Sequence, residues 1–369
     1  MDGANRSMLQ LIEELRSNHF VVPMVVCPPT NKKGYSIITL CKEKDITCYT
    51  LPIVHFKQTG IPSTIYRIRT FLSELRWNLY LIYQLKDVKF DLVYSNSSII
   101  DMGAYLAMAR KVPHIWHLRE FGEEDFHMSS VLGKRYEKWI YSKCTYAIAI
   151  SQAIRDKFKP YFNDRLLLIY NGIVSRPDTL ASLHQNKEFT FCMVGRIEAN
   201  KNQLEAIKAC AILRRKTNLA FKLLIIGKGS EEYVNLLKEK VDMLGIAENI
   251  QFVSYQKDIS LLLKQCDVGL TLSTSEAFGR VTIEYMMQNL AVIASNSGAN
   301  PEIVTDGSTG LLYELGNAEQ LADKMKSLLE NRSLLEEIAS NGRQFSLSHF
   351  TSIQNSEKIF GLIQSTLRR

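Results

Sequence analysis

Three features are absent from this 369-residue chain, and each absence argues against a class of protein. The longest apolar runs, such as 146–150 and 166–169, are far shorter than the roughly 18 residues of a membrane-spanning helix. The seven cysteines include no Cys-x-x-Cys pair, which argues against a metal cluster or disulfide framework and predicts buried thiols. The first ten residues lack the blocks of a secretory signal, so a cytoplasmic location is expected.

Positive charge is concentrated in the first half of the chain. Residues 1–175 contain 23 Lys and Arg against 16 Asp and Glu, whereas the remainder contains 22 of each kind, so the net charge of +7 lies in the first half. A nucleic-acid partner would require a concentrated basic stripe with stacking aromatics or a known binding motif, and the sequence shows neither. We therefore expect no nucleic-acid partner.

The hydrophobic pattern predicts an α/β fold. Apolar runs rich in β-branched residues alternate with amphipathic stretches, which is typical of a parallel sheet covered by helices on both faces. The pattern occurs twice, over runs at 21–26, 91–96, 113–118, 146–151 and 166–170, and then at 189–194, 222–227, 250–254, 268–273 and 291–295. The repeated pattern predicts two Rossmann-like domains. Ligands of such sheets bind beyond the carboxyl ends of the strands, so the expected site is a cleft between two facing domains.

The pattern predicts one domain at 1–175, a second at 176–350 and a final helix at 351–369. The first domain opens unusually. Its sequence starts with a turn at 3–7 and continues into a helix at 7–15, so the first strand of its sheet is predicted to be missing. Either Met1 is an internal methionine of a longer protein, or the empty position in the sheet is covered in another way.

The segment 61–86 has a helical pattern rich in large apolar and aromatic residues, with Arg67, Arg69, Arg76 and Lys86 spaced through it. One interpretation is a core helix whose arginines reach water. The other is a helix on the surface of an anionic membrane, as basic and aromatic residues together would suit. The net positive charge of residues 1–175 adds support to the membrane interpretation, and the sequence leaves both interpretations open.

The segment 273–313 is the most informative for chemistry. The apolar run 268–273 leads through Gly279 into a helix that begins near Arg280 or Val281, so the free N–H groups of a helix start are expected at a strand end, where they would bind a diphosphate. Glu276 and Glu284 lie eight positions apart around this start. They are either ordinary acids at a helix start or carboxylates that accept hydrogen bonds from sugar hydroxyls.

Residues 276–286 resemble the Glu-x7-Glu motif of the retaining, GT-B-fold glycosyltransferases of family GT4, and 298–313 resembles the stretch that follows it there. The block 194–209 is similar to the Gly-Arg…Lys signature of that family, with Gly195, Arg196 and Lys201. Further similarities lie in two other stretches. Residues 225–237 resemble the family's Gly-x-Gly strand end, and residues 252–258 fall where its base-contacting loop usually lies. In the first half, 115–125 resembles family members with a strand-end histidine, here His117, while the turn at 3–7 departs from the family's opening loop at Asp2 and Asn5.

The resemblance implies that 1–175 is an acceptor-binding domain, that 176–350 is a nucleotide-sugar-binding domain and that the helix at 351–369 packs back toward the first domain. It also implies a role for each matching residue. Arg196, Lys201 and the helix start at Gly279 and Arg280 would stabilise the charge that grows on the donor's β-phosphate. Glu284 would hold the ribose, Glu276 the hydroxyls of the sugar, and the backbone around Phe278 the sugar ring. His117 would contact the transferred sugar. The expected catalytic residues are therefore Glu276, His117, Arg196 and Lys201, and the expected donor-binding residues are Gly195, Arg196, Lys201, Glu276, Phe278, Gly279, Arg280 and Glu284.

The implied reaction is transfer of a hexose, with retained anomeric configuration, from a UDP- or GDP-linked donor to a hydroxyl of a glycan or lipid-linked acceptor. Surface polysaccharide assembly at the inner face of the cytoplasmic membrane is the expected setting, with the protein peripheral there. No cofactor is expected, and the absence of an Asp-x-Asp motif fits a metal-independent reaction. Two alternatives stay open: an inverting GT-B transferase or epimerase, and an inactive or truncated sugar-nucleotide-binding protein.

Overall fold

The computed structural model describes residues 3–29, 36–52, 57–58, 64–126, 128–175, 188–256 and 258–368. The chain divides into two compact units: unit 1 comprises Met1–Gly172 with Ser352–Arg369, and unit 2 comprises Ile173–Thr351. Most of the stretch 175–188, where the sequence suggests a domain boundary, lies outside the described residues.

Unit 1 alternates strands and helices along most of its length. Its elements are α1 (Gly3–His19), β1 (Met24–Cys27), α2 (Ile37–Glu43), β2 (Thr47–Thr50), β3 (Lys57–Gln58), α3 (Thr64–Gln84), β4 (Val93–Ser95), α4 (Met102–Arg110), β5 (His114–Leu118), α5 (Glu123–Phe126), β6 (Met128–Ser129), α6 (Lys134–Tyr141), β7 (Tyr146–Ala149), α7 (Gln152–Phe162), β8 (Leu166–Leu168) and α15 (Ser352–Leu367).

The described strands of unit 1 form a four-stranded parallel sheet in the order β4-β5-β7-β8, a two-stranded parallel sheet of β1 and β2, and a short antiparallel pair of β3 and β6. Val26 of β1 and Val93 of β4 pack against one apolar cluster, whose buried members include Leu81 and Leu106. β5 is buried at all five positions, which explains why its sequence is an uninterrupted apolar run apart from two histidines. The sequence analysis missed β2, because its four residues include two threonines and only two partly buried positions.

The start of unit 1 differs from the sequence prediction. Residues 3–7 do not form a turn, because α1 already begins at Gly3 and buries Leu9, Leu11 and Leu15. Asp2, where the resemblance to the family's opening loop departs, lies outside the described residues. The predicted strand at 21–26 is also displaced, since β1 starts only at Met24, directly after a proline that has no N–H group for a sheet.

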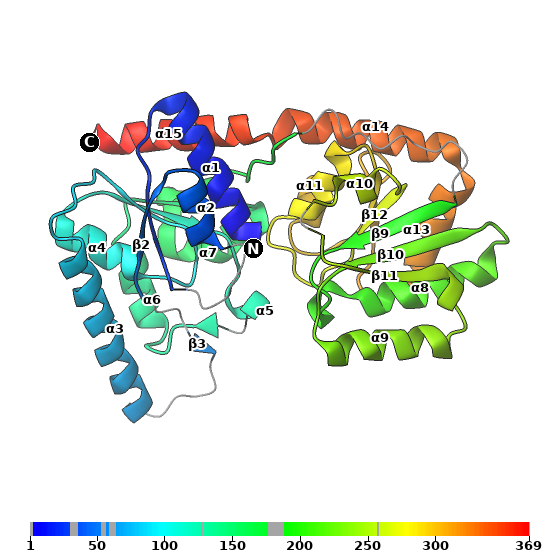
Figure 1. Cartoon of the computed structure of the whole chain (residues 1–369), viewed down its shortest axis with the longest axis horizontal. Helices are drawn as coiled ribbons and strands as arrows, with labels where there is room; N and C mark the ends of the chain where they lie inside the picture. The colour runs from blue at the N-terminus through cyan, green and yellow to red at the C-terminus, as the bar shows by residue number, and fades with distance from the viewer. Residues whose placement is uncertain are drawn as a thin grey trace. The chain divides into compact units, whose positions relative to one another are not determined.

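The last helix, α15, packs against α1 in unit 1. Ile359 and Leu362 join Ile115 and Ile148 of the sheet in one apolar cluster. The contact is also polar, because Ser352 donates a hydrogen bond to Glu14 over 2.7 Å. Figure 1 shows α15, in red, running beside α1, in dark blue.

Unit 2 contains β9 (Phe189–Val194), α8 (Gln203–Lys216), β10 (Phe221–Gly227), α9 (Glu231–Met243), β11 (Ile250–Ser254), α10 (Ser260–Leu263), β12 (Val268–Thr271), α11 (Arg280–Met287), β13 (Ala291–Ser295), α12 (Asn300–Ile303), β14 (Leu311–Tyr313), α13 (Ala318–Glu330) and α14 (Arg332–His349). Its described strands form a six-stranded parallel sheet in the order β11-β10-β9-β12-β13-β14. Figure 1 shows α8 and α9 below these strands and α11 above them.

This strand order decides where unit 2 can bind a ligand. From β9 the chain moves outward to β10 and β11, then returns to β12 on the other side of β9 and moves outward again. The connections after β9 and β12 therefore leave in opposite directions and part at the carboxyl ends of these two strands. Close packing supports the arrangement: Gly269 of β12 leaves space for the ring of Tyr285, which a Cβ atom would meet at 2.1 Å.

Candidate active site

The candidate residues of unit 2 lie on the two connections that leave this switch point. Gly195, Arg196 and Lys201 follow β9, with Lys201 in a short 3-10 helix at Ala199–Lys201. Glu276, Phe278 and Gly279 lie between β12 and α11, and Arg280 and Glu284 lie in α11 itself. Because β9 and β12 are neighbours, segments about 75 residues apart in the sequence come together at one edge of the sheet.

Lys201 and Glu276 form an ion pair at the centre of this edge. The Lys201 Nζ atom lies 3.1 Å from Glu276 Oε2 and donates a second hydrogen bond to Ser273 Oγ over 3.3 Å. The backbone N–H of Gly279 donates to the other carboxylate oxygen, Glu276 Oε1, over 3.1 Å. Burial by itself would raise the pKa of Glu276, but the Lys201 charge and these hydrogen bonds outweigh it and lower the pKa. Glu276 is therefore a carboxylate at neutral pH.

The backbone of Glu276 is held from behind by Gly298. The carbonyl of Glu276 accepts a hydrogen bond from the N–H of Ala299 over 2.7 Å. Gly298 adopts a φ of +56°, and a Cβ atom there would lie 2.5 Å from Glu276 N and 2.4 Å from Glu276 O. The glycine at the start of 298–313 thus allows the close approach that orients the Glu276 loop.

The start of α11 is the second feature of the site. Gly279 precedes the helix with a φ of +80°, a conformation that favours glycine. The first N–H groups of a helix have no partner within it, so the α11 start directs donors outward. Arg280 Nε donates to Glu284 Oε1 over 2.8 Å, and both side chains are mostly buried. Phe278 directs its ring into the core against Phe350, with ring centroids 6.1 Å apart.

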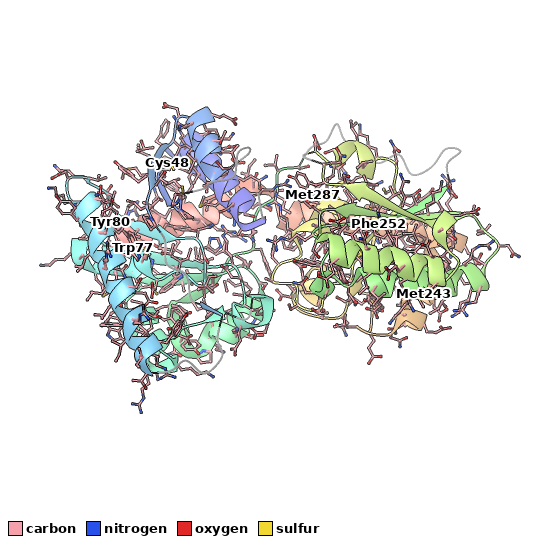
Figure 2. All side chains as sticks on the ribbon, turned by 60° about the horizontal axis from the view of Figure 1, so that its bottom comes forward. Cys48, Trp77, Tyr80, Met243, Phe252 and Met287 are labelled. Carbon is pink, nitrogen blue, oxygen red and sulfur yellow. The ribbon has the colours of Figure 1, made fainter. Side chains whose placement is uncertain are left out.

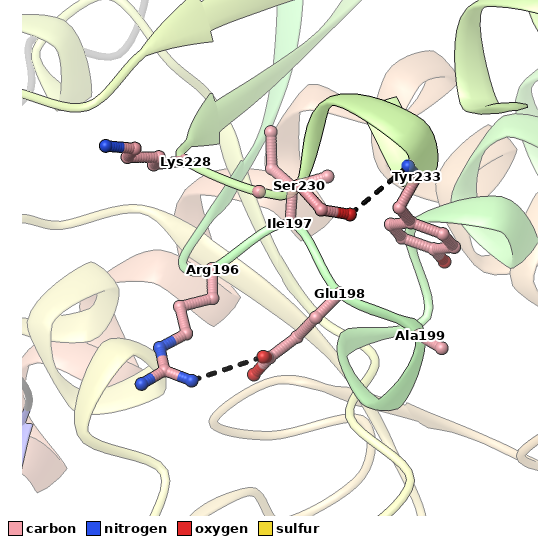
Figure 3. Close-up of a pocket in the computed structure, with 8 residues that line it drawn as sticks. Arg196, Ile197, Glu198, Ala199, Lys228, Ser230 and Tyr233 are labelled. Carbon is pink, nitrogen blue, oxygen red and sulfur yellow. Dashed lines mark hydrogen bonds and ion pairs between the residues drawn. The ribbon is translucent and has the colours of Figure 1, made fainter. Parts of the chain in front are cut away.

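Arg196 is the most exposed of these candidates. Its side chain is 67% exposed, and Nη1 lies 3.3 Å from Glu198 Oε2. Both line an open pocket of about 560 Å³ together with Lys228, Ser230 and Tyr233, at the start of α9 (Figure 3). The Arg196 guanidinium therefore borders open space beside the end of β9.

Two glycines at and after the end of β10 allow close backbone packing beside this pocket. A Cβ atom on Gly227 would lie 1.8 Å from the carbonyl oxygen of Gly195, and one on Gly229 would lie 2.3 Å from that of Ile197. The Gly-x-Gly pattern at the end of β10 thus lets this strand end approach the segment that carries Arg196. In the neighbouring stretch 252–258, Lys257 lies outside the described residues.

His117 belongs to unit 1, at the end of β5, and is fully buried. Its Nδ1 atom lies 2.5 Å from Tyr94 Oη and 3.2 Å from an Nη2 donor of Arg119. Burial, and then the nearby Arg119 charge, lower the pKa of His117 well below its ordinary value. The ring is therefore neutral, and because Nδ1 accepts hydrogen bonds, the proton resides on Nε2. Among the described residues, Nε2 has no hydrogen-bond partner.

Arg119, which belongs to the 115–125 stretch matched from the sequence, positions His117 together with residues that the sequence did not single out. Arg119 Nε donates to Asn96 Oδ1 over 2.5 Å, and its Nη1 donates to Asn171 Oδ1 over 2.6 Å. Tyr94 and Asn96 lie at the end of β4, and Asn171 follows β8. Ser273, beside Lys201, follows β12 in the same way. A polar residue within three positions of a strand end was the available signal for Asn96, Asn171 and Ser273, whereas Tyr94 lies inside β4 and carried no such signal.

Unit 1 contains a second buried histidine, His114, which gives a testable pH dependence. Burial lowers its pKa from 6.5 to about 3. As the pH falls below 6.5, this histidine becomes protonated in the unfolded chain but stays neutral in the folded one. Its contribution to the free energy of unfolding is therefore constant above pH 6.5 and falls by about 1.4 kcal/mol per pH unit below it. On going from pH 7.5 to 5.0, we expect His114 to lower the free energy of unfolding of unit 1 by about 2 kcal/mol. His117 should act in the same direction.

The three tryptophans, Trp77, Trp116 and Trp139, all lie in unit 1, so tryptophan fluorescence during urea unfolding reports on this unit. Between these two pH values, the free energy of unfolding should fall by about 2 kcal/mol less in the variant His114→Gln than in the wild type. The control His349→Gln replaces an exposed histidine of unit 2 and should follow the wild type. Equal acid sensitivity of all three chains would contradict the expectation.

Two family models together match nearly the whole chain. The model "Glycosyltransferase Family 4" matches residues 1–175, and the model "Glycosyl transferases group 1" matches residues 177–345. The chain belongs to the GT4-type glycosyltransferases. This confirms the resemblance drawn from the motifs around Arg196 and Glu276.

Relatives and solved structures agree with this assignment. The glycosyltransferase is 25% identical over 322 residues to an uncharacterized glycosyltransferase of Methanocaldococcus jannaschii, MJ1178, covering 82% of this chain and 86% of that protein. It is 31% identical over 169 residues to the capsular polysaccharide biosynthesis glycosyltransferase CapM of Staphylococcus aureus, covering 45% of this chain and 43% of that protein. The crystal structure of Anabaena HepE in complex with UDP matches with a TM-score of 0.78 at 20% identity, covering 99% of this chain and 96% of that one.

The structural match confirms the predicted GT-B fold class. The glycosyltransferase is thus an α/β protein with parallel sheets flanked by helices in both units. No helix within the described ranges has the length and hydropathy that crossing a bilayer requires.

Proposed function

We propose that this glycosyltransferase transfers a hexose from a nucleotide diphosphate sugar to a hydroxyl of a glycan or lipid-linked acceptor, with retention of the anomeric configuration and without a metal ion. The observation that carries the proposal is the Lys201–Glu276 ion pair beside the start of α11, at the switch point between β9 and β12. This edge combines a cation, the backbone amides of a helix start and an ionised carboxylate, which together suit a diphosphate joined to a sugar.

In the proposed reaction, the bond between the anomeric carbon and a β-phosphate oxygen breaks, and the bond to the acceptor oxygen forms on the same face of the sugar. The leaving phosphate takes the acceptor proton, so no enzyme nucleophile is required. The demand on the protein is to stabilise the negative charge that grows on the phosphate. Lys201, Arg196 and the N–H groups at the start of α11 supply that stabilisation, with Gly195 and Gly279 allowing the backbone to approach.

The two glutamates of the motif orient the sugars on either side of the diphosphate. Glu276 is ionised, and its two oxygens accept hydrogen bonds from hydroxyls of the transferred sugar. Glu284 uses Oε1 for Arg280, and its other oxygen accepts from the ribose. The backbone at Phe278 borders the sugar ring.

His117 contributes a neutral donor from unit 1. Tyr94 and Arg119 engage Nδ1, so the Nε2 proton is available to a hydroxyl of the transferred sugar. A neutral imidazole suits this role, since a charged one would oppose the positive charge that develops at the anomeric carbon as the glycosidic bond breaks.

The proposed donor is a UDP- or GDP-linked hexose. The UDP form is supported by HepE, whose solved structures include complexes with UDP and with UDP-glucose. The name of CapM supports a role in surface polysaccharide biosynthesis. Inverting transfer, epimerisation and inactive sugar-nucleotide binding are the competing functions.

A donor panel tests the proposal. A nucleotide sugar at 100 times its Kd stabilises its binding unit by about 2.7 kcal/mol, so we expect one donor of a UDP and GDP panel to raise the melting temperature of unit 2 by roughly 5–10 °C. With that donor and a lipid-linked glycan acceptor, we expect turnover that EDTA does not reduce and an NMR spectrum showing the donor's own anomeric configuration. An inverted product would establish the competing transferase chemistry, and binding without turnover on any acceptor would favour the inactive protein.

A further inference from the structure

Helix α3 of unit 1 exposes its apolar side chains and buries polar ones. Its buried positions include Thr70, Glu74 and Asn78. Its exposed positions include large apolar residues that are 41–70% exposed, namely Ile65, Ile68, Leu72, Leu75 and Leu79. A surface helix of a water-soluble unit normally has the reverse arrangement. We propose that the exposed face of α3 lies on the surface of an anionic lipid bilayer.

The exposed apolar residues form one continuous stripe. They follow one another at alternating spacings of three and four residues, which places them on a single face of a helix. At 1.5 Å per residue the stripe from Ile65 to Leu79 is about 21 Å long. Such a length of apolar surface exceeds what scattered exposed residues provide and marks a contact surface.

The opposite side of α3 fixes its orientation on unit 1. Leu81, near its end, and Leu85, which follows it, join Met102 and Leu106 of α4 in one buried apolar cluster. Figure 1 shows α3, in blue, along the outside of unit 1 beside α4, and Figure 2 shows Trp77 and Tyr80 on it. Because these contacts hold the inner side in place, the helix cannot turn its apolar stripe inward without losing them.

The charges around the stripe fit an anionic partner. Arg67, Arg69, Arg76 and Lys86 are all exposed, and the only acidic residue between positions 64 and 86, Glu74, is buried. The aliphatic parts of long basic side chains can follow the apolar surface while their charges reach lipid phosphates.

Aromatic side chains complete the pattern. Arg76 lies over the ring of Trp77, 5.6 Å from its centroid, and Lys86 lies over the ring of Tyr83 at 4.8 Å. Tyrosine and tryptophan rings favour the boundary between water and lipid, where one end is apolar and the other is wet.

A second copy of the chain fits this face less well. Alternating three- and four-residue spacing also occurs in the apolar seam of coiled coils. However, pairing two α3 helices along the stripe would bring Arg69 and Arg76 of both copies to one seam, with no exposed carboxylate on either helix to oppose them. The net positive charge therefore favours lipid phosphate over self-association.

Vesicle sedimentation of the full chain tests the inference without any sugar donor. We expect binding to vesicles of phosphatidylglycerol and phosphatidylcholine to be at least tenfold tighter than binding to phosphatidylcholine alone. The variant Leu72→Gln/Leu79→Gln should weaken binding by at least tenfold. The variant Arg69→Gln/Arg76→Gln should weaken it by about 30-fold, because each basic residue near an anionic surface contributes about one factor of five.

Leu236→Gln serves as the matched control, because Leu236 is 47% exposed on α9 of unit 2, and it should bind vesicles like the wild type. All variants replace exposed side chains, and unchanged melting temperatures and donor binding will show that they fold. Absence of vesicle binding, or equal binding by the Leu72→Gln/Leu79→Gln variant, would overturn the inference. So would a dimer in light scattering that this variant abolishes, which would assign the face to a second copy. Each of these results leaves the proposed transferase activity untouched.

Discussion

The variant Lys201→Ala is expected to lower kcat by on the order of 10²–10³-fold while the chain stays folded. The Nζ atom of Lys201 is the cation that contacts Glu276 at 3.1 Å, at the edge where the donor diphosphate is proposed to bind. Its removal takes away a positive charge from the position where the leaving phosphate becomes negative. A loss of this size corresponds to about 3–4 kcal/mol of transition-state stabilisation. Steady-state kinetics with the donor identified by thermal shift measures it.

Lys216→Ala provides the matched control. Lys216 also belongs to unit 2, is 28% exposed, and pairs with Glu319 and Asp323 at the last residue of α8, whereas Lys201 lies before the first residue of that helix. It should retain wild-type kcat. Arg196→Ala should show a loss in the same direction as Lys201→Ala, and near-normal activity in both variants would refute the proposed diphosphate site.

The variant Glu276→Gln is expected to lower kcat/KM by on the order of 10²-fold or more, with the shape of the side chain preserved. The wild-type carboxylate is ionised because Lys201 and the Gly279 N–H hold its pKa low. Glutamine has one acceptor oxygen instead of two, so it cannot accept from Gly279, Lys201 and two sugar hydroxyls at once. Kinetics on donor and acceptor separately will locate the loss.

Glu336→Gln is the control for this change, because Glu336 forms an exposed ion pair with Arg332 in α14 of the same unit. It should behave as wild type. The combination Lys201→Ala/Glu276→Gln adds a further check. Because the two side chains are in direct contact, kcat/KM of the double variant should fall by a smaller factor than the product of the factors for the two single variants. Independent, multiplicative losses would show that the ion pair is not a functional unit.

The hydrophobic pattern predicted the sheet of unit 2 closely because most of its strands are buried along nearly their whole length. β9 and β13 have the predicted bounds, and α11 begins at Arg280, one of the two predicted positions. The pattern was less successful where burial is one-sided or slight. β2 escaped detection with two exposed threonines, and α1 includes residues 3–7 because nothing in that segment prevents a helix from starting at Gly3.

The candidate site divides in the same way. Motif spacing identified Lys201 and Glu276, since both lie in short, recognisable segments. It did not identify Tyr94, Asn171 or Ser273, whose contacts arise only because parallel strands end side by side. Nor did it show that Gly298 supports the Glu276 backbone, a contact between residues 22 positions apart.

The sequence by itself determined the fold class, the family and the identity of the charged groups, because periodicity and motif spacing are local properties of the chain. It left open which side of the 61–86 helix is buried, since its apolar and basic residues fit both a core helix and a membrane surface. Only the tertiary structure decided this question, because α4 and its neighbours occupy one side of α3 and leave Leu72 and Leu79 to the outside. Likewise, the pKa values of Glu276 and His117 depend on burial and on charges from other elements, which exist only once the strands have come together.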